Sequence, residues 1–231
     1  MATRQVLAEL AREWAQATQQ TGGPDLAIES VGGVDAARRV EAGEAFDLVF
    51  LAGDALQRLE AGGYLQPASI VALMDSQVAV AVPQGARPPA IDSETAVRQA
   101  VLDASSIGYS TGPSGKALLA LFARWGVAER LQSRLVQAQP GVPVGALLAS
   151  GRVALGFQQL SELQGLPGID ILGLLPAPIG ITTVFAGAVG KASRAPQQAA
   201  RVLRFMADPA RHPTLARHGM APAHIITGDT P

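Results

Sequence analysis

The first apolar positions of the chain recur with the spacing of an amphipathic helix. One face collects Val6, Leu7, Leu10, Ala11, Trp14 and Ala15. A recurrence at about 3.6 residues is typical of an α-helix that buries one side. We therefore predict a helix over residues 3–20, which the Thr21-Gly22-Gly23-Pro24 turn ends.

Beyond this helix, short apolar runs alternate with segments of helical period. The runs predicted as strands are residues 26–28, 47–51, 77–82, 106–109, 153–157, 169–172 and 182–189. The segments predicted as helices are residues 35–42, 54–60, 93–103, 116–125, 158–163, 196–206 and 209–218, with one more around Leu147 that ends near Gly151. Strands that alternate with helices build a mixed, mostly parallel sheet with helices on both faces, so the predicted class is α/β.

The pattern opens on a helix, whereas a β-α-β chain is expected to open on a strand. Residues 1–4 lead directly into that helix, without the basic start and apolar core of a secretory leader. We therefore expect a first strand, and any export signal, to lie upstream of Met1. The alternative is a fold that begins with this helix.

One long uncharged run could be a membrane-spanning segment by its length. Residues 171–190 carry no charge and are numerous enough to span a bilayer. Pro176 and Pro178 divide the run into two short apolar stretches. This pattern predicts a buried strand, a turn and a second buried strand, and no membrane-spanning segment.

Composition removes several classes of function. The 231 residues carry a net charge of −1 and 4% aromatic residues, which argues against a nucleic-acid partner. The chain has no cysteine, so disulfides, thiol catalysis and thiolate metal sites are excluded. His212, His218 and His224 recur every six residues and do not share a helix face, so no metal site is expected.

The loop before Lys116 does not fit a phosphate-binding motif. Ser110 stands where the P-loop needs its first glycine, and Ala117 replaces the hydroxyl that binds magnesium. The sequence also lacks a glycine fingerprint for dinucleotides and a nucleophile elbow. We therefore expect no cofactor, and the sequence assigns no catalytic residue.

Four small polar loops remain as candidate binding elements. They are Gly32-Gly33, Ser110–Gly115, Pro143–Gly145 and Gln158-Gln159. Each opens a predicted helix or follows a predicted strand, where unpaired N–H groups and the helix dipole attract anions. In open α/β sheets, ligands bind beyond the carboxyl ends of the strands. Each loop also fits an ordinary turn or helix cap, so both interpretations stay open.

Four segments in order resemble the molybdate-binding-protein-like branch of the type 2 periplasmic solute-binding proteins. They are Arg38–Gly43 with Phe46–Phe50, Ile107–Gly115, Val153–Leu163 and Gly219–Pro222. The resemblance covers nearly the whole chain. It implies two α/β lobes, residues 1–81 with 180–231 and residues 82–179, joined by strands that cross near Val82 and Ile179. The ligand is then expected in the cleft between the lobes.

The resemblance also identifies where ligand contacts should fall. In the molybdate binders, serines of two loops, two backbone amides and a tyrosine hold the oxyanion. The corresponding positions here are Ala2 or earlier, Gly32 to Val34, Ser114, a position near Pro143, and Gln159. Nearly every side-chain contact differs, because glycines widen the pocket and a glutamine both donates and accepts hydrogen bonds. We expect a di- or tricarboxylate rather than molybdate, with Arg38 either a further anion clamp or a solvated residue.

The loops and the resemblance together predict a set of ligand contacts and leave three hypotheses for the function. The set is Thr3, Gly32, Gly33, Ser110, Thr111, Ser114, Gly115, Pro143, Gln158 and Gln159. The preferred hypothesis is a monomeric solute-binding protein that captures a small anion for an ABC-type permease, in the periplasm by resemblance, with a cytoplasmic location as alternative. The same branch is similar to aconitate isomerase, so the second hypothesis is an isomerase of a small carboxylate. A ligand-sensing domain is the third, although no DNA-binding segment accompanies it.

Overall fold

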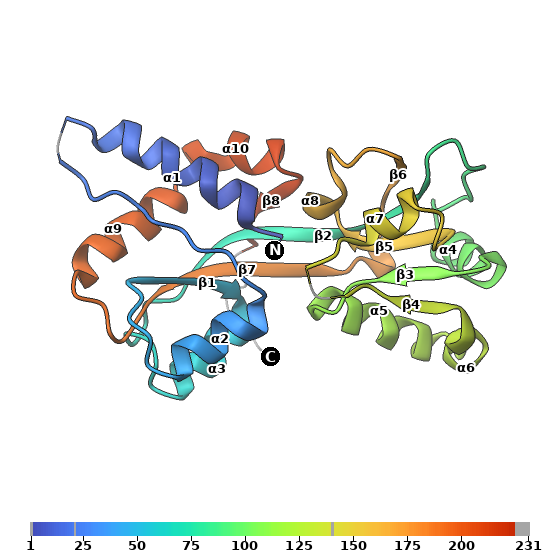
Figure 1. Cartoon of the computed structure of the whole chain (residues 1–231), viewed down its shortest axis with the longest axis horizontal. Coiled ribbons are helices and arrows are strands. Elements are labelled where there is room, and N and C mark those ends of the chain that lie inside the picture. The colour runs from blue at the N-terminus through green and yellow to red at the C-terminus, as the bar shows by residue number, and fades with distance from the viewer. Residues whose placement is uncertain (1, 21, 140, 225–231) are drawn as a thin grey trace. The chain divides into compact units, whose positions relative to one another are not determined.

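The computed structural model describes residues 2–20, 22–139 and 141–224, and the chain forms two compact units (Figure 1). Unit 1 comprises Met1–Asp75 and Val184–Pro231, and unit 2 comprises Ser76–Thr183. The chain passes from one unit to the other within strands β2 (Val71–Pro83) and β7 (Thr182–Val189). The sequence placed these two passages near Val82 and Ile179, so unit 2 extends further along both strands than expected.

Unit 1 combines helices with a small mixed sheet. Its elements are α1 (Arg4–Thr18), α2 (Gly33–Glu41), β1 (Leu48–Ala52), α3 (Gly53–Ala61), α9 (Pro196–Met206), the 3-10 turn η3 (Pro209–Arg211), α10 (His212–Arg217) and β8 (Met220–Pro222), with the adjoining parts of β2 and β7. Strand β1 runs antiparallel to β7, with Leu48 opposite Val189. Strand β8 pairs with β2.

The two faces of the unit 1 sheet carry separate cores. One core holds four of the six apolar positions predicted for α1 together with residues of α9, α10 and β2: Val6, Leu7, Leu10, Trp14, Met74, Val202, Met206 and Leu215. The other two predicted positions differ, because Ala11 is half-buried and Ala15 is exposed. The other core lies beneath α2 and α3 and contains Val40, Val49, Leu51, Leu56 and Leu59. Figure 1 shows α1, α9 and α10 together on one side of β1 and β7, and α2 with α3 on the other. The amphipathic pattern therefore places helices on both faces, as expected from the sequence.

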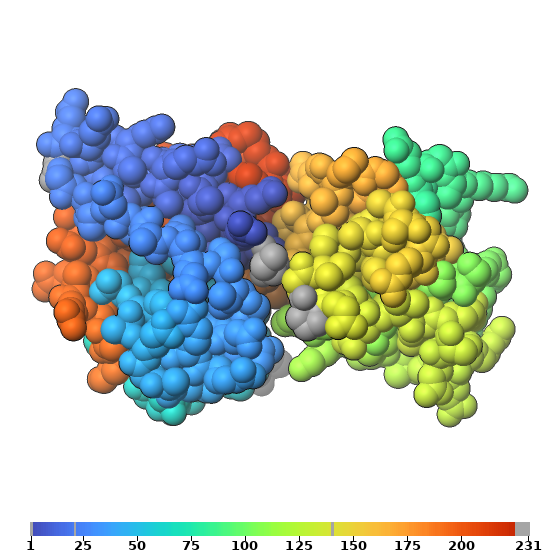
Figure 2. All heavy atoms as spheres, in the orientation of Figure 1, coloured from blue at the N-terminus to red at the C-terminus, as the bar shows by residue number. Residues whose placement is uncertain are grey.

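A charged network fastens α10 to α1, which lie against each other in Figures 1 and 2. Glu9 accepts hydrogen bonds from Arg217 at 2.5 Å and from the His218 ring at 2.6 Å. Arg211 donates to Glu13 at 2.5 Å. The hydrogen bond from Arg217, followed by that from His218, holds the pKa of Glu9 below its usual range. Two of the three histidines of the chain thus lie in or beside this helix-to-helix contact.

We expect Glu9→Gln to lower the melting temperature most at neutral pH. A carboxylate with a lowered folded-state pKa stabilises the fold above its unfolded pKa, and that stabilisation is lost as the pH falls through the folded value. The melting temperatures of the variant and the parent should therefore converge between about pH 7 and about pH 3. Thermal unfolding across this range measures the difference. A gap that stays constant with pH would show that the ionised form of Glu9 is not the stabilising species.

Unit 2 is built on three parallel strands and two antiparallel ones. Its elements are α4 (Glu94–Asp103), β3 (Ile107–Tyr109), α5 (Pro113–Arg124), α6 (Ala128–Leu131), the 3-10 turn η1 (Gln132–Arg134), β4 (Leu135–Gln137), α7 (Val144–Ala149), β5 (Leu155–Gln159), α8 (Leu160–Leu163), β6 (Ile169–Leu174) and the 3-10 turn η2 (Ala177–Ile179). Strand β3 is parallel to both β4 and β5. Strand β2 runs antiparallel to β5 and β6.

Two cores cover this sheet. One packs α4, α5 and α6 on it, through residues that include Val97, Val101, Leu118, Phe122, Leu131 and Phe157. The other packs α7 and α8 on it, through Ala79, Ala81, Val144, Leu148, Val153 and Leu163. The predicted α/β class with a mixed sheet and helices on both faces is thus found in the structure. Antiparallel pairing is more frequent than expected, because the long strands β2 and β7 run against their neighbours β5, β6 and β1.

Local predictions differ from the structure at a few places. The strand expected at residues 26–28 is absent; Leu26 and Ile28 pack against the core of α1 instead, and Trp14 Nε1 donates to the Pro24 carbonyl at 3.0 Å. Helix α5 begins at Pro113 rather than Lys116, and β5 continues through Gln159. The short elements α6, β4 and β8 have too few residues to show a period. Throughout the described ranges, every helix is too short or too polar to traverse a bilayer.

Candidate functional site

The candidate residues of unit 2 lie at one edge of its sheet. Strands β3, β4 and β5 are parallel, with Tyr109 opposite Gln137 and Phe157. Their carboxyl ends therefore meet at the same edge, where ligands bind in open α/β sheets. The predicted segments lie at these ends: the Ser110 loop follows β3, Pro143–Gly145 comes after β4 at the start of α7, and Gln158-Gln159 end β5. Parallel pairing thus brings together residues that are far apart in the sequence.

The first segment is a tight turn from β3 into α5. Gly112 occupies the N-cap position in an extended conformation and Pro113 begins the helix. The hydroxyls of Ser110 and Ser114 lie 3.0 Å apart, and Ser114 is buried. Thr111 is exposed on the same turn. Two hydroxyls at the start of a twelve-residue helix supply donors where the helix dipole favours negative charge.

Gly115 determines the shape of this turn. A Cβ on Gly115 would lie 1.8 Å from the Ser110 carbonyl oxygen, far inside the contact distance of the two atoms. The Gly115 N–H donates to the Gly112 carbonyl at 3.1 Å, so the turn closes tightly on the helix. Only glycine permits the approach that keeps Ser110 beside Ser114. Gly115, predicted as a ligand contact, therefore contributes to the proposed site through its backbone.

The second segment is fixed by Gln158. The Val144 N–H, at the start of α7, donates to Gln158 Oε1 at 2.7 Å. Gln158 Nε2 donates to Glu162 Oε2 at 2.8 Å. Both the oxygen and the nitrogen of this buried amide are therefore engaged inside unit 2. Pro143, which precedes Val144, has no N–H to donate to a ligand. Gln158, predicted as a ligand contact, acts in the structure as the side chain that joins α7 and α8 to β5.

Gln159 has the opposite surroundings. It is the last residue of β5 and is 4% exposed, yet its side-chain amide makes no hydrogen bond to any residue that the structure describes. Its amide oxygen and nitrogen are not among the enclosed atoms that lack a partner, so they remain accessible to a ligand or water. Gln159 and the serine pair thus combine an unpaired amide with two hydroxyls at the same sheet edge.

Three predicted residues belong to unit 1. Thr3 precedes α1, is half-buried, and its side chain makes no capping bond. Gly32 and Gly33 begin α2 and are exposed. A Cβ would lie 3.5 Å from the Asp35 carboxylate at Gly32 and 3.7 Å from Leu51 at Gly33, which are ordinary contacts. Neither packing nor a positive φ requires these glycines, so the absence of side chains here is not explained by the fold of unit 1.

Arg38 takes the solvated role left open by the sequence. Its side chain is 72% exposed and pairs with Asp35 at 3.3 Å. The neighbouring Arg39 instead bonds Glu29 at 2.7 Å and also Glu44. Both guanidinium groups are thereby engaged with carboxylates of unit 1, and an exposed pair of this kind contributes little to stability.

One polar pair was not apparent from the sequence. Asp75, on β2, is 2% exposed, and its Oδ2 lies 2.5 Å from Nδ1 of His224. Its other oxygen, Oδ1, is enclosed and has no hydrogen-bond partner. The two residues are 149 positions apart, so no local spacing connects them. The available signal was a single acid inside the apolar run of residues 71–82.

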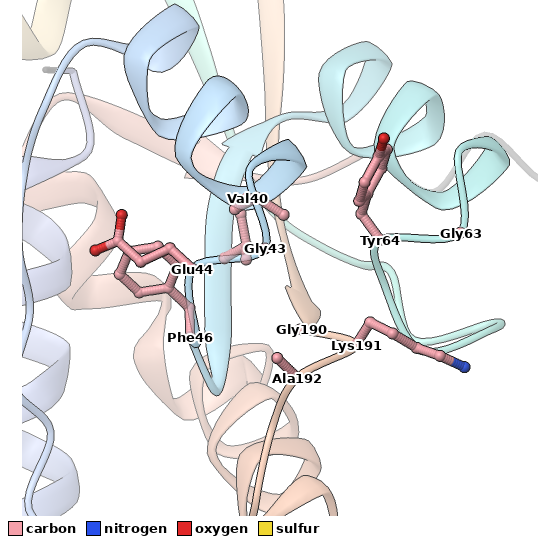
Figure 3. Close-up of a pocket in the computed structure, with 10 residues that line it drawn as sticks. Val40, Gly43, Glu44, Phe46, Gly63, Tyr64, Gly190, Lys191 and Ala192 are labelled. Carbon is pink, nitrogen blue, oxygen red and sulfur yellow. The ribbon is translucent and has the colours of Figure 1, made fainter.

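Figure 3 shows a hollow elsewhere in unit 1, with a volume of about 180 Å³. It lies where α2 and α3 end, and its lining is Val40, Gly43, Glu44, Phe46, Val49, Gly63, Tyr64, Gly190, Lys191 and Ala192. The Glu44 carboxylate and the Lys191 ammonium extend in opposite directions. None of the predicted contacts lines it. The hollow offers no converging polar groups, so we do not regard it as the ligand site.

Known proteins resemble this chain over most of its length. A family model described as bacterial extracellular solute-binding protein matches residues 1–221. An aconitate isomerase from Pseudomonas sp is 36% identical over 217 residues, which are 91% of this chain and 82% of that protein.

Solved structures share the fold at low sequence identity. The periplasmic molybdate-binding protein of Azotobacter vinelandii has a TM-score of 0.76 at 20% identity, covering 96% of both chains. A substrate-binding domain from Clostridium difficile has a TM-score of 0.78 at 15% identity, covering 97% of this chain and 96% of that one. These likenesses confirm the predicted fold class and the resemblance on which it drew.

Proposed function

The chain belongs to the bacterial extracellular solute-binding protein family, and we propose that it binds a small organic polycarboxylate at the carboxyl ends of β3, β4 and β5. Membership implies a small ligand and an ABC-type transporter as partner, and it suggests a periplasmic location. The finer claim is the ligand class. It rests on the donors at this sheet edge and on the relative that is 36% identical.

The unpaired amide of Gln159, a residue that is only 4% exposed, carries the proposal. A side-chain amide offers one acceptor and two donor hydrogens, so it can bond to both a carboxylate and a hydroxyl or carboxylic acid of an organic ligand. Ser110, Ser114 and the N-terminus of α5 supply the converging donors for a carboxylate. A compact tetrahedral oxyanion would use only donors, and the acceptor of Gln159 would then remain unpaired.

The open edge of unit 1 supports the same ligand class. Gly32 and Gly33 leave room beside the exposed start of α2, and Val34 next to them is 75% exposed. An exposed valine beside small residues suits the carbon skeleton of an organic acid better than an inorganic oxyanion. We therefore propose Thr3, Gly32 and Gly33, within unit 1 by itself, as ligand contacts that provide space and backbone groups.

A thermal-shift screen tests the ligand class. One set of samples contains molybdate, tungstate, sulfate or phosphate, and the other contains cis-aconitate, trans-aconitate, citrate or malate. A ligand at about 100 times its dissociation constant adds about 2.7 kcal/mol, which for this size corresponds to about 5–10 °C. We expect this shift with the carboxylates. A shift with the tetrahedral oxyanions alone would refute the proposed ligand class and would indicate an inorganic oxyanion as the ligand.

Isomerisation of the same ligand is a second candidate function. The specific observation is that the 36% identical relative, matched over 91% of this chain, is an aconitate isomerase. A binding site becomes an isomerase when one positioned group moves a proton on the bound acid. Proton NMR of cis- and trans-aconitate in the presence of the protein distinguishes the two functions, because a binding protein leaves their ratio unchanged.

A further inference from the structure

Unit 2 contains a second pair of serine hydroxyls. Ser76, on β2, and Ser161, in α8, have their Oγ atoms 3.4 Å apart. Among the residues that the structure describes, neither hydroxyl has another hydrogen-bond partner. An O–H···O hydrogen bond ordinarily measures about 2.5–3.0 Å, so this contact is long. The hydrogen-bonding capacity of both groups is therefore largely unused.

Strand pairing places these hydroxyls beside Gln159. Val78, two residues after Ser76 on β2, is directly opposite Gln159 on β5. Ser161 comes two residues after Gln159, so the serine pair continues the register of β2 and β5 beyond the end of β5. Because side chains alternate along a strand, Ser76 and Gln159 share the face that carries Val78 and Phe157. Both of the latter residues belong to the core in which α5 packs on the sheet.

Gln159 therefore has a serine pair on each side of it. Strand β5 lies between β2 and β3 in the sheet (Figure 1). The pair of Ser76 and Ser161 is on the β2 side, and the pair of Ser110 and Ser114, which follows β3, is on the other side. Neighbouring strands are about 4.8 Å apart, so two strand spacings separate the pairs by about 10 Å. A hydrogen bond of about 2.8 Å at each end leaves about 4 Å between the outer ligand oxygens, which suits two carboxylates of one small acid.

The two serines of the second pair differ in exposure, so they can act differently. Ser161 is half-buried, and its hydroxyl is therefore the one that can reach a ligand. Ser76 is 0% exposed, so it can act only through Ser161. A hydroxyl both donates and accepts hydrogen bonds. When Ser76 donates to Ser161 Oγ, the proton of Ser161 is free for a carboxylate.

Two acids adjoin the pair in the sequence, and both have partners elsewhere. Glu162 accepts a hydrogen bond from Gln158 Nε2 at 2.8 Å, and Gln158 also caps α7. Asp75 bonds to the ring of His224 at 2.5 Å. Neither carboxylate is a hydrogen-bond partner of the serine hydroxyls, so both hydroxyls remain available as donors.

We propose that Ser161 binds a second carboxylate of the ligand, that Ser76 positions its hydroxyl, and that the site thereby selects acids with two or more carboxylates. One carboxylate lies at Ser110, Ser114 and the start of α5, and the other lies at Ser161. The amide of Gln159 bonds to the part of the acid between them. A monocarboxylate of the same chain length occupies only one of the two positions. This inference rests on the proposed carboxylate ligand.

Titration with two chain-matched acids tests the selectivity. Succinate and butyrate have the same carbon chain, and butyrate has one carboxylate fewer. We expect the parent to bind succinate at least about 10-fold more tightly than butyrate, because a further hydrogen bond to a charged group contributes this much. Ser161→Ala should weaken succinate binding about 10-fold and leave butyrate binding unchanged. Butyrate binding also shows that the variant is folded.

Ser150→Ala is the matched control. The Ser150 hydroxyl bonds to the Ala146 carbonyl at the end of α7, outside the proposed site. This variant removes a serine hydroxyl from the same unit, and it should keep the parent's affinity for both acids.

Ser76→Ala tests the positioning role. Alanine occupies less space than serine and introduces no clash, so we expect the melting temperature to stay near that of the parent. The ratio of succinate to butyrate affinity should fall, by less than in Ser161→Ala, because Ser161 keeps its hydroxyl but loses the group that orients it. A purely structural role of Ser76 would change the melting temperature and leave this ratio as it is.

Three results would count against these assignments in different ways. A parent ratio retained in Ser161→Ala would overturn the contact of Ser161 with a second carboxylate. A parent that binds cis-aconitate, but binds succinate no better than butyrate, would overturn the selection by carboxylate number and leave the proposed function intact. A parent that binds neither succinate nor cis-aconitate would overturn the proposed function itself.

Discussion

Replacing Gln159 with alanine is expected to raise the dissociation constant of the carboxylate about 10- to 100-fold. Loss of a hydrogen bond to a charged group costs about 1.5–3 kcal/mol, and 1.4 kcal/mol corresponds to a factor of ten. The fold should tolerate the change, because the Gln159 amide bonds to no described residue of unit 2. Calorimetric titration of the parent and the variant with the ligand found in the screen measures the effect.

Gln158 provides a matched control at the adjacent position. Its amide caps the start of α7 and bonds Glu162, so Gln158→Ala leaves the buried Val144 N–H without its acceptor. We expect a loss of stability of about 1–3 kcal/mol with a smaller effect on affinity. If Gln159→Ala bound ligand as tightly as the parent while Gln158→Ala did not, our assignment of the two neighbours would be reversed. If both variants bound the ligand as tightly as the parent, the proposed ligand site at the end of β5 would be wrong.

Gly115→Ala is expected to have the second large effect, because it reverses the usual preference of helices. Alanine in a helix is normally favoured over glycine by about 1 kcal/mol. Here the new Cβ would lie 1.8 Å from the Ser110 carbonyl oxygen, which is backbone and cannot move aside by rotating. The loop must shift away from α5, at a cost of about 3 kcal/mol. We therefore expect a lower melting temperature together with loss of carboxylate binding.

Gly112→Ala is the control for this variant. The Gly112 N-cap has φ −80°, and a Cβ there meets no atom within 4 Å. The substitution lies on the same turn but introduces no clash, so both stability and binding should stay near those of the parent. If Gly115→Ala also kept the melting temperature and the carboxylate affinity of the parent, the tight turn would not be the element that holds Ser110 beside Ser114.

The amino-acid sequence by itself determined most of the local structure. The stripe from Val6 to Trp14 predicted α1, and the alternation of apolar runs and helical segments predicted an α/β fold. Such patterns succeed because side-chain period and burial are properties of neighbouring residues. The same reasoning placed the Ser110 turn and Gln158-Gln159 at strand ends, where parallel pairing brings them to one edge.

The tertiary structure alone decided which of these residues are free to act. Gln158 and Gln159 are the same residue type at adjacent positions, yet the first caps α7 and the second has no partner among the described residues. Asp75 and His224 meet across 149 positions because β8 returns beside β2. Leu26 and Ile28 look like a strand but pack on α1 instead. Each outcome depends on which distant group occupies the space beside a residue, and no local period in the sequence carries that information.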